Sequence, residues 1–571
     1  MMPWLPAIAG VVIESSSATE NFLLDFRRTL GELFAENYDN ASEICRRDYG
    51  MDGIFIESHE HGRNCLADGI SIKKTASYPM SAMWIQSTLG GSSTRRTEGI
   101  ADIRESASAA HIYGQNLVAA ESLTASGVDR QAYTYCPENL KPAADLEMAA
   151  GVNRFVIHES SHQPVDDKVP GMGMSIYGQW FNRHECWAEQ ARAWTDYLAR
   201  SCAMLQQGRF VADLLYYYGE DTNVTAQFSL KELDVPFGYS FDFIGAEALM
   251  NEISVRKGKL VTRSGMEYSA LCVGGQGQPM SDEVRKCIAR LKEAGAKVVE
   301  NGDCSAAVEG VEADVILPHG EGHVAFVHRS MPSAEIYWLS NQEDKDRSME
   351  LSFRCSGRRP MLWHPESGDK RELCWAFRNG RTVIPLEFTA GEAYFVVFGE
   401  PVKEESHSAP ATKLKETHIL EGPWNVSFQE KRGAPESAVF EKLEPWNESR
   451  NPGIRYFSGT ATYSKAFHFD HSGARVVLDL GKVCNIAEVR LNGTAVRTLW
   501  RAPFKVDISD ALNYGENLLE IAVTNLWPNR LIGDEQPGVK QRITYTTWPF
   551  YKAGDPLLQS GLTGPVRILE Y

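Results

Sequence analysis

The sequence lacks the marks of disulfide-rich, membrane-spanning and secreted proteins. Its 11 cysteines are dispersed, without a Cys-x-x-Cys pair, which predicts mostly free thiols in a reducing compartment. No stretch approaches the ~20 apolar residues of a membrane span, and the first residues lack the basic and apolar regions of a signal peptide. We therefore expect no membrane partner. The localisation stays open, with a bacterial periplasmic or secreted location expected if an upstream portion precedes Met1.

Basic residues are also in short supply. Lysine and arginine number 58 against 75 aspartates and glutamates, which gives a net charge of -17. This balance argues against nucleic acid as a partner, because a phosphate backbone attracts clustered positive charge. A neutral polar ligand is compatible with it. The sequence shows no Gly-x-Ser-x-Gly elbow, so serine-hydrolase chemistry is not indicated. His158 and His162 flank Glu159 in the spacing His-Glu-x-x-His, but they follow a predicted strand and not a helix, which disfavours zinc binding.

What is present divides the chain into four regions. At 571 residues the chain is too long for one core and predicts three or four domains of ~150 residues each. Residues 1–235 alternate short apolar strands with amphipathic helices, the pattern of parallel β/α units. Only about four or five units are visible, whereas a closed eight-unit barrel takes ~250 residues. We expect a partial (β/α)8 barrel of the TIM type, and an open sheet also fits.

The other three regions predict smaller domains, so the fold class is α/β plus all-β. Residues 236–325 carry a further strand and helix pattern, typical of a small open α/β domain. Residues 326–410 and 411–571 show alternating strands separated by polar turns, which predict β-sandwiches. In the last region Asn492-Gly493 indicates a tight hairpin, because both residues accept a positive φ. Three residues of an irregular loop are expected to brace the last domain against the first region, the alternative being that they contact sugar: Asn525, Trp527 and Arg530.

Acidic residues follow three successive predicted strands of the first region. Glu57, Glu121 and Glu159 come at or just beyond the ends of apolar runs. Reacting groups of β/α folds collect where strands end, so we expect one acidic site. Paired carboxylates suit glycoside hydrolysis, and an oxygen-rich cluster suits calcium. The alternative is that each glutamate caps a helix or pairs with an arginine such as Arg183 or Arg209.

Glu57 and Glu121 are the catalytic candidates, and Glu57 is preferred to Glu60 because it directly follows its apolar run. The predicted substrate-binding residues are Glu60, His158, Glu159, His162, Arg183 and Trp187. Six aromatic residues suit stacking on sugar faces, although aromatic side chains belong more often to a core: Trp84, Tyr113, Tyr177, Trp180, Phe181 and Trp187.

Several segments resemble glycoside hydrolase family 106, the α-L-rhamnosidases. In the first region these are Phe26–Leu30, Ala109–Gly114, Ala119–Thr124, Asn153–His158 and Leu205–Asp213. In the last region they are Val523–Gln536 and Thr546–Trp548. The segments lie in order over most of the chain, so the resemblance is specific.

The resemblance implies an inverting α-L-rhamnosidase that hydrolyses terminal α-L-rhamnosyl residues of plant or microbial glycans. It implies a (β/α)8 barrel, accessory β-domains of which the last is galactose-binding-like, and a calcium-assisted site whose ligands are unknown. Glu57 and Glu121 match active-site glutamates, and His158 and His162 would line the sugar pocket. The oligomeric state is not indicated.

Two departures from the family keep alternatives open. The family barrel begins upstream of the segment that matches Leu5–Gly10, and the strand expected to carry the general acid precedes that point. The family also has a glutamate shortly after Pro79-Met80, where this sequence has Ala82. The alternatives are a carbohydrate-binding homologue without catalysis and a truncated fragment that is inactive alone.

Overall fold

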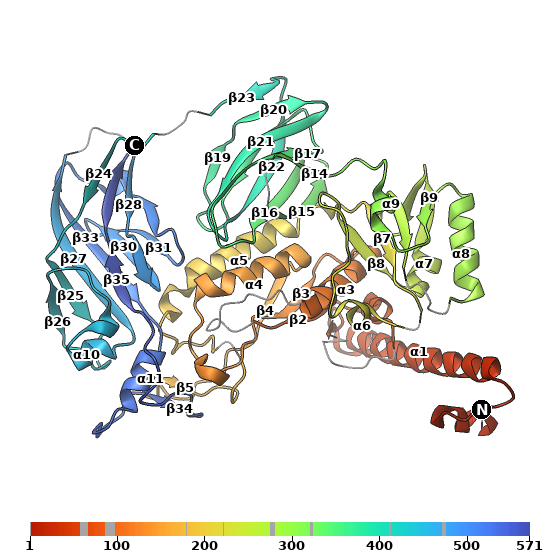
Figure 1. The fold of residues 1–571 in the computed structure, drawn as a ribbon, viewed down its shortest axis with the longest axis horizontal. Helices are drawn as coiled ribbons and strands as arrows, with labels where there is room; N and C mark the ends of the chain where they lie inside the picture. Colours follow the sequence, from red (N-terminus) through yellow and green to blue (C-terminus); the bar gives the residue numbers. More distant parts are fainter. Residues whose placement is uncertain are drawn as a thin grey trace.

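The computed structural model describes residues 2–57, 67–85, 97–178, 180–220, 222–274, 280–319, 324–409, 413–470 and 475–571. The chain is a mixed α/β protein with several sheets spread along an elongated body (Figure 1). Parallel sheets and helices occupy the amino-terminal part, and antiparallel sheets follow them. Within the described ranges, no helix is long and apolar enough to cross a membrane.

The first sheet is parallel, and its strands follow one another in chain order. The strands are β1 (Phe55–Glu57), β2 (Tyr78–Met83), β3 (Ala119–Ser122) and β4 (Arg154–Ile157). All three pairings are parallel, as the alternating pattern predicts. The sequence analysis does not predict β2, which contains Pro79, a residue usually found at sheet edges or outside strands. Sequential order is also what a segment of a barrel has, and barrel closure stays a prediction.

Helices cover one face of this sheet. Helix α3 (Thr97–Tyr113) and helix α4 (Pro137–Ala150) lie against it. Met83 of β2 and Ala120 of β3 share a buried cluster with Ile103 of α3. Successive side chains of a strand point to opposite faces, so this face carries every second residue of each strand.

The opposite face of the first sheet is only partly covered. Phe55 is 54 % exposed and Val156 is 38 % exposed. Tyr78 and Arg154 lie on the same face, and with Phe55 they line a hollow of ≈ 970 Å³. Parallel sheets are normally covered on both faces, so this face has room for more polypeptide than the described residues supply.

Two valines of this region test whether one face of the first sheet is buried and the other exposed. We expect Val156→Ser to change the free energy of unfolding by less than about 0.5 kcal/mol, because the side chain is already hydrated. Val152→Ser, which empties a position in the buried cluster, should cost about 2 kcal/mol or more. Urea unfolding followed by circular dichroism measures both, and equal losses would contradict an uncovered face.

A second parallel sheet corrects the expected boundary at residue 235. It contains β7 (Leu214–Tyr217), β8 (Phe241–Ile244), β12 (Ala270–Val273) and β13 (Lys297–Val299), in the order β13-β12-β7-β8. Strand β7 therefore belongs with strands beyond 235. Because β7 is buried along its whole length, its apolar run does not show which sheet it joins. The helices of this part are α6 (Val224–Phe228), α7 (Ala246–Glu252), α8 (Asp282–Glu293) and α9 (Cys304–Val308).

Two antiparallel sheets follow and share one buried cluster. The first sheet holds β14 (Val315–His319), β17 (Arg347–Phe353), β21 (Arg381–Phe388), β20 (Trp375–Arg378) and β23 (Ser406–His407). The second holds β19 (Lys370–Glu372), β18 (Arg358–Trp363), β22 (Ala393–Pro401), β16 (Ala334–Asn341), β15 (Val324–Met331) and β6 (Arg209–Phe210). Strand β14 was expected in the small α/β domain but pairs with β17, so the boundary at 325 also moves.

Around its own buried cluster, the last part of the chain has a short two-stranded sheet, β29 (Lys482–Cys484) with β35 (Gly561–Gly564), and two larger sheets. One holds β24 (Glu416–Ile419), β36 (Arg567–Glu570), β28 (Val476–Asp479) and β32 (Lys505–Asp507). The other holds β26 (Ser437–Phe440), β25 (Trp424–Phe428), β27 (Thr460–Phe469), β33 (Gly515–Thr524), β30 (Ile486–Leu491) and β31 (Thr494–Leu499). The predicted hairpin at Asn492-Gly493 is confirmed, since both residues have positive φ and Leu491 pairs with Thr494.

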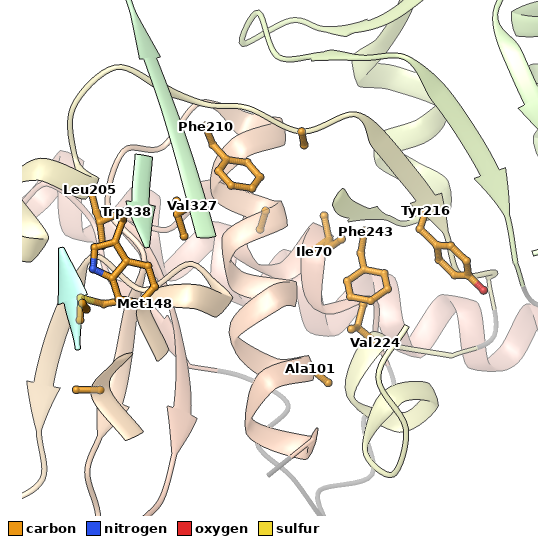
Figure 2. Close-up of a cluster of buried hydrophobic side chains, with 14 of the residues drawn as sticks. Ile70, Ala101, Met148, Leu205, Phe210, Tyr216, Val224, Phe243, Val327 and Trp338 are labelled. Carbon is orange, nitrogen blue, oxygen red and sulfur yellow. The ribbon is translucent and has the colours of Figure 1, made fainter. Parts of the chain in front are cut away.

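The largest buried cluster joins these parts through helix α3. Figure 2 shows Ile70, Phe243 and Val224 on one side of this region and Met148, Leu205 and Trp338 on the other. The cluster also takes in Trp527 and Leu531 of the terminal part. The described parts are therefore held together by one continuous apolar core.

Helix α1 (Ser16–Tyr49) projects from one end of the body (Figure 1). Three of its larger apolar side chains, Leu33, Phe34 and Ile44, are exposed, and its fully buried positions are small residues. Ser15 caps its start by accepting from the Ala18 N–H, and Gly50 ends it in the left-handed region. The helix forms from local signals and buries little of its apolar surface.

Candidate active site

The carboxyl ends of β1, β2 and β3 bring Glu57, Ala82 and Glu121 onto one face. Glu57 pairs in register with Met80, and Ala82 pairs with Glu121. Partners in a parallel register point the same way, and every second residue shares that face. The face is the partly covered one that also carries Phe55. Glu57 and Glu121 therefore share one face of the sheet, with strand β2 between them.

The Glu121 carboxylate is held by the turn that follows its strand. The Thr124 hydroxyl donates to Glu121 Oε1 at 2.6 Å. The turn is fixed to the neighbouring strand, because the Leu123 N–H donates to Met83 O and the Ile85 N–H donates to Thr124 O. Among the described residues, the other carboxylate oxygen, Glu121 Oε2, accepts no hydrogen bond and is available to a ligand.

His158 and Glu159 lie at the end of β4, beside Glu121. The His158 N–H donates to Ser122 O at 3.1 Å. Glu159 Oε1 accepts from the Ser161 hydroxyl at 2.5 Å and from the Met174 N–H at 3.1 Å. Glu159 therefore organises its own loop, and neither a helix cap nor Arg183 accounts for it.

Two ring nitrogens at this edge lack hydrogen-bond partners among the described residues. They are His158 Nδ1 and Trp84 Nε1, and both are buried. Trp84 packs edge-on against Tyr177, with ring centroids 5.5 Å apart, and Tyr177 is exposed. Buried polar atoms are nearly always paired in native proteins, so these two nitrogens suit a ligand rich in hydroxyl groups.

The remaining predicted residues are placed differently. Arg183 is exposed and donates to Asp166 Oδ1 and to Gln163 O, each at 2.7 Å; this contact lowers the pKa of Asp166. His162 is exposed nearby. Trp187 is 1 % exposed and donates to Tyr135 O. In this structure Trp187 therefore has no ring face on which a sugar could stack, because both faces lie in the core.

Glu60 falls outside the described residues, and calcium finds no support in them. Within the described ranges, the group of His, Cys, Asp or Glu side chains whose ligand atoms come close enough for a metal is Glu416, His418 and Glu570, in the terminal sheets. The carboxylates at the strand ends do not form such a group. Calcium stays a prediction from the resemblance.

The sequence analysis misses the polar groups behind the site. Glu147 of α4 accepts from the Ser122 hydroxyl at 2.5 Å, and burial raises the pKa of Glu147 well above its usual value. Lys73, Asp102 and Glu105 form a second buried set. Helical positions such as these resemble solvated residues in a sequence, and only the packing of α3 and α4 against the sheet shows them as buried.

The loop after β4 is tied to the terminal part of the chain. The Trp527 indole N–H donates to His184 O at 2.9 Å. Further along, β5 (Pro170–Gly171) pairs with β34 (Tyr545–Thr546). The predicted bracing role is confirmed for Trp527. Asn525 instead bonds Phe457 O within its own domain.

Comparison with known proteins identifies the chain. Residues 1–306 and 303–377 match the family model described as alpha-L-rhamnosidase, glycoside hydrolase family 106. The chain belongs to glycoside hydrolase family 106. A solved rhamnosidase from Novosphingobium sp. PP1Y is 37% identical with a TM-score of 0.94, and the match covers 100% of this chain and 58% of that one. A protein of Formosa agariphila named "Putative beta-glucuronidase" is 26% identical over 100% of this chain and 71% of that protein.

This family-106 chain spans 58% of the length of the solved rhamnosidase, so the activity of a whole enzyme does not pass to it directly. The two relatives carry different activity names. Membership places the chain in a family of glycoside hydrolases.

Proposed function

We propose that the chain forms the Glu57–Glu121 part of the active site of an inverting α-L-rhamnosidase. The observation that carries this proposal is the placement of both glutamates on one partly open face at the carboxyl edge of a parallel sheet. The ring nitrogens of Trp84 and His158, which have no hydrogen-bond partner among the described residues, are available to sugar hydroxyls. The substrate is a terminal α-L-rhamnosyl residue of a plant or microbial glycan, and the sheet is a segment of a (β/α)8 barrel followed by β-sandwiches, the last galactose-binding-like.

In this mechanism Glu57 acts as the general base. Its carboxylate takes a proton from water while the water oxygen attacks the anomeric carbon, and the bond to the leaving oxygen breaks. A carboxylic acid about 6.5–9.5 Å away protonates that oxygen. Glu121, held by Thr124, binds sugar hydroxyls. We assign the general acid to none of the described residues.

The test is hydrolysis of an aryl α-L-rhamnoside by the purified chain, with and without added calcium. Glu57→Gln should lower any turnover by about 10²–10⁴-fold, and Glu121→Gln should mainly raise KM. Glu189→Gln, a change at an exposed glutamate outside the strand ends, is the matched control. Turnover that survives Glu57→Gln overturns the assignment of the base.

A second candidate is a sugar-binding homologue without catalysis. Ala82 favours it, because Ala82 stands directly beside Glu121 where the resemblance leads one to expect a glutamate. Calorimetry with L-rhamnose distinguishes the two: binding by a folded chain without turnover supports this candidate. Ala82→Glu should then introduce turnover if the missing carboxylate is the reason. A chain that neither binds nor turns over is an inactive fragment.

A further inference from the structure

A carboxyl group lies fully buried directly behind the turn that carries Glu121. Glu147 of α4 has no exposed surface, and its Oε2 atom lies 2.5 Å from Ser122 Oγ. Successive side chains of a strand point to opposite faces, so Ser122 points to the helix-covered face of the first sheet and Glu121 points to the partly covered one. The same strand end is therefore held from behind by Glu147 and presents Glu121 in front.

Glu147 lacks a counter-charge in the part of the chain that the structure describes. No positively charged side chain there acts on it, and its other oxygen, Oε1, is buried without a hydrogen-bond partner. An isolated carboxylate in such surroundings is far more costly than an uncharged carboxyl group, and burial raises the pKa of Glu147 well above its ordinary value. The side chain is therefore uncharged and carries a proton.

The hydrogen bonds around Ser122 support the same protonation state. A serine hydroxyl has one proton to donate, yet Ser122 Oγ lies 2.5 Å from Glu147 Oε2 and 3.0 Å from Ala120 O. An ionised Glu147 would take the serine proton and leave the contact with Ala120 O without one. An uncharged Glu147 donates its own proton to Ser122 Oγ, so the serine hydroxyl can donate to Ala120 O. Only the uncharged form makes a hydrogen bond of each contact.

The turn that follows Ser122 contains an unfavourable backbone conformation. Leu123 has a φ of 66°, in the left-handed region that residues other than glycine adopt at a cost. Backbone hydrogen bonds tie the turn to the end of β2, and the contact between Glu147 and Ser122 ties it to α4 from behind. At the end of the turn, the Thr124 hydroxyl donates to Glu121 Oε1 at 2.6 Å. The direction of the Glu121 carboxylate therefore depends on how firmly the turn is held.

We propose that Glu147 is a positioning residue for Glu121, acting through Ser122 and the turn that ends at Thr124. The uncharged carboxyl group holds the strand end against α4, so that Thr124 keeps the Glu121 carboxylate pointing into the proposed sugar site. The proposal rests on the role given to Glu121 in the proposed function. It gives a reason for a buried acid at a position where an apolar side chain would pack at less cost.

Amide hydrogen exchange tests the positioning without any need for turnover. Glu147→Met keeps most of the side-chain volume but removes the hydrogen bond to the turn, so the turn should open more often. Exchange should become about tenfold faster at the Leu123 and Ile85 amides, which make the backbone hydrogen bonds of the turn; a change of this size corresponds to the loss of one hydrogen bond. The Ala82 amide, which donates to a carboxylate of α3, should exchange as before.

Three further variants complete the exchange test. Glu147→Gln should retain the slow exchange, because its amide N–H can donate to Ser122 Oγ in place of the carboxyl proton. Ser122→Ala should reproduce the faster exchange of Glu147→Met. Ser81→Ala is the matched control, since the buried Ser81 hydroxyl donates to Ala119 O at 3.1 Å, away from the turn, and it should leave the exchange of the turn unchanged. Unchanged exchange in Glu147→Met, or an equal increase at Ala82, overturns the proposal.

Turnover provides a second readout where the chain is active. Glu147→Met should raise KM for an aryl α-L-rhamnoside by about 2–10-fold with little change in kcat, and it should have no further effect in the Glu121→Gln background. An equal rise in both backgrounds is the mark of a merely structural residue and overturns the proposal. If Glu147→Met does not fold, Ser122→Ala decides it. Absence of turnover in the unmodified chain counts against the proposed function and leaves the exchange test to decide the role of Glu147.

Discussion

Trp527→Ala is expected to detach the terminal part from the rest of the chain and to lower the free energy of unfolding by about 3–5 kcal/mol. The side chain is fully buried and belongs to the core shared with the first sheet and its helices. Its indole N–H bonds His184 O, and the Arg432 guanidinium lies 4.3 Å above its ring. Truncation leaves a cavity, an unpaired carbonyl and a buried cation together.

Guanidinium unfolding monitored by circular dichroism measures the loss, and limited proteolysis shows whether the terminal part separates. Trp548→Ala is the matched control, since this tryptophan is 46% exposed and should cost less than about 1 kcal/mol. Similar losses for the two variants would contradict the bracing role. A separate early transition in Trp527→Ala alone would support it.

Asp314→Ala should destabilise the chain by about 3–5 kcal/mol, because it leaves buried cations without their acceptor. Asp314 is 1 % exposed and accepts from His328 Nδ1 at 2.7 Å and from the Tyr337 hydroxyl at 2.9 Å. Arg354 lies 3.5 Å away. Asp344→Ala, a change at an exposed aspartate, is the control and should alter stability by less than about 0.5 kcal/mol.

The buried pair of Asp314 and His328 also predicts how the stability of the chain depends on pH. Burial alone would raise the pKa of Asp314, but the positive charges of His328 and Arg354 lower this pKa below the ordinary value of 3.8. The contribution of Asp314 to stability is therefore lost as the pH falls through the lowered pKa. Burial alone would lower the pKa of His328, but the negative charges of Asp314 and Glu335 raise this pKa above 6.5. The contribution of His328 to stability is therefore lost as the pH rises through the raised pKa. The pair therefore stabilises most between about pH 4 and 6.5. Asp314→Ala should flatten the pH profile of the melting temperature there, and an unchanged profile would refute the assignment.

Local patterns in the sequence suffice for part of this structure. Apolar runs ending in Glu57, Glu121 and His158 predict β1, β3 and β4 and place their ends together, because parallel strands share a direction. Asn492-Gly493 predicts its hairpin because few residues tolerate the required φ. These features depend on a few residues that are neighbours in the chain, so the local sequence is enough to predict them.

Other features depend on partners distant in the chain. The sequence analysis misses strand β2, which has Pro79 inside it. An aromatic residue such as Trp187 suits both a core and a sugar platform, and only its neighbours decide between them. A lysine such as Lys73 is usually solvated. Here it is buried because α3 places two carboxylates beside its ammonium group.

The ties between the terminal part and the loop after β4 bear on how such enzymes can change. Trp527 bonds the His184 carbonyl, and β34 pairs with β5, so the segment that follows His158 takes its shape from residues hundreds of positions later. A lineage cannot exchange this terminal part for an unrelated one without reshaping the edge of the proposed sugar site. Recombination should therefore keep the two together, and chimaeras meant to alter specificity should carry both from the same parent.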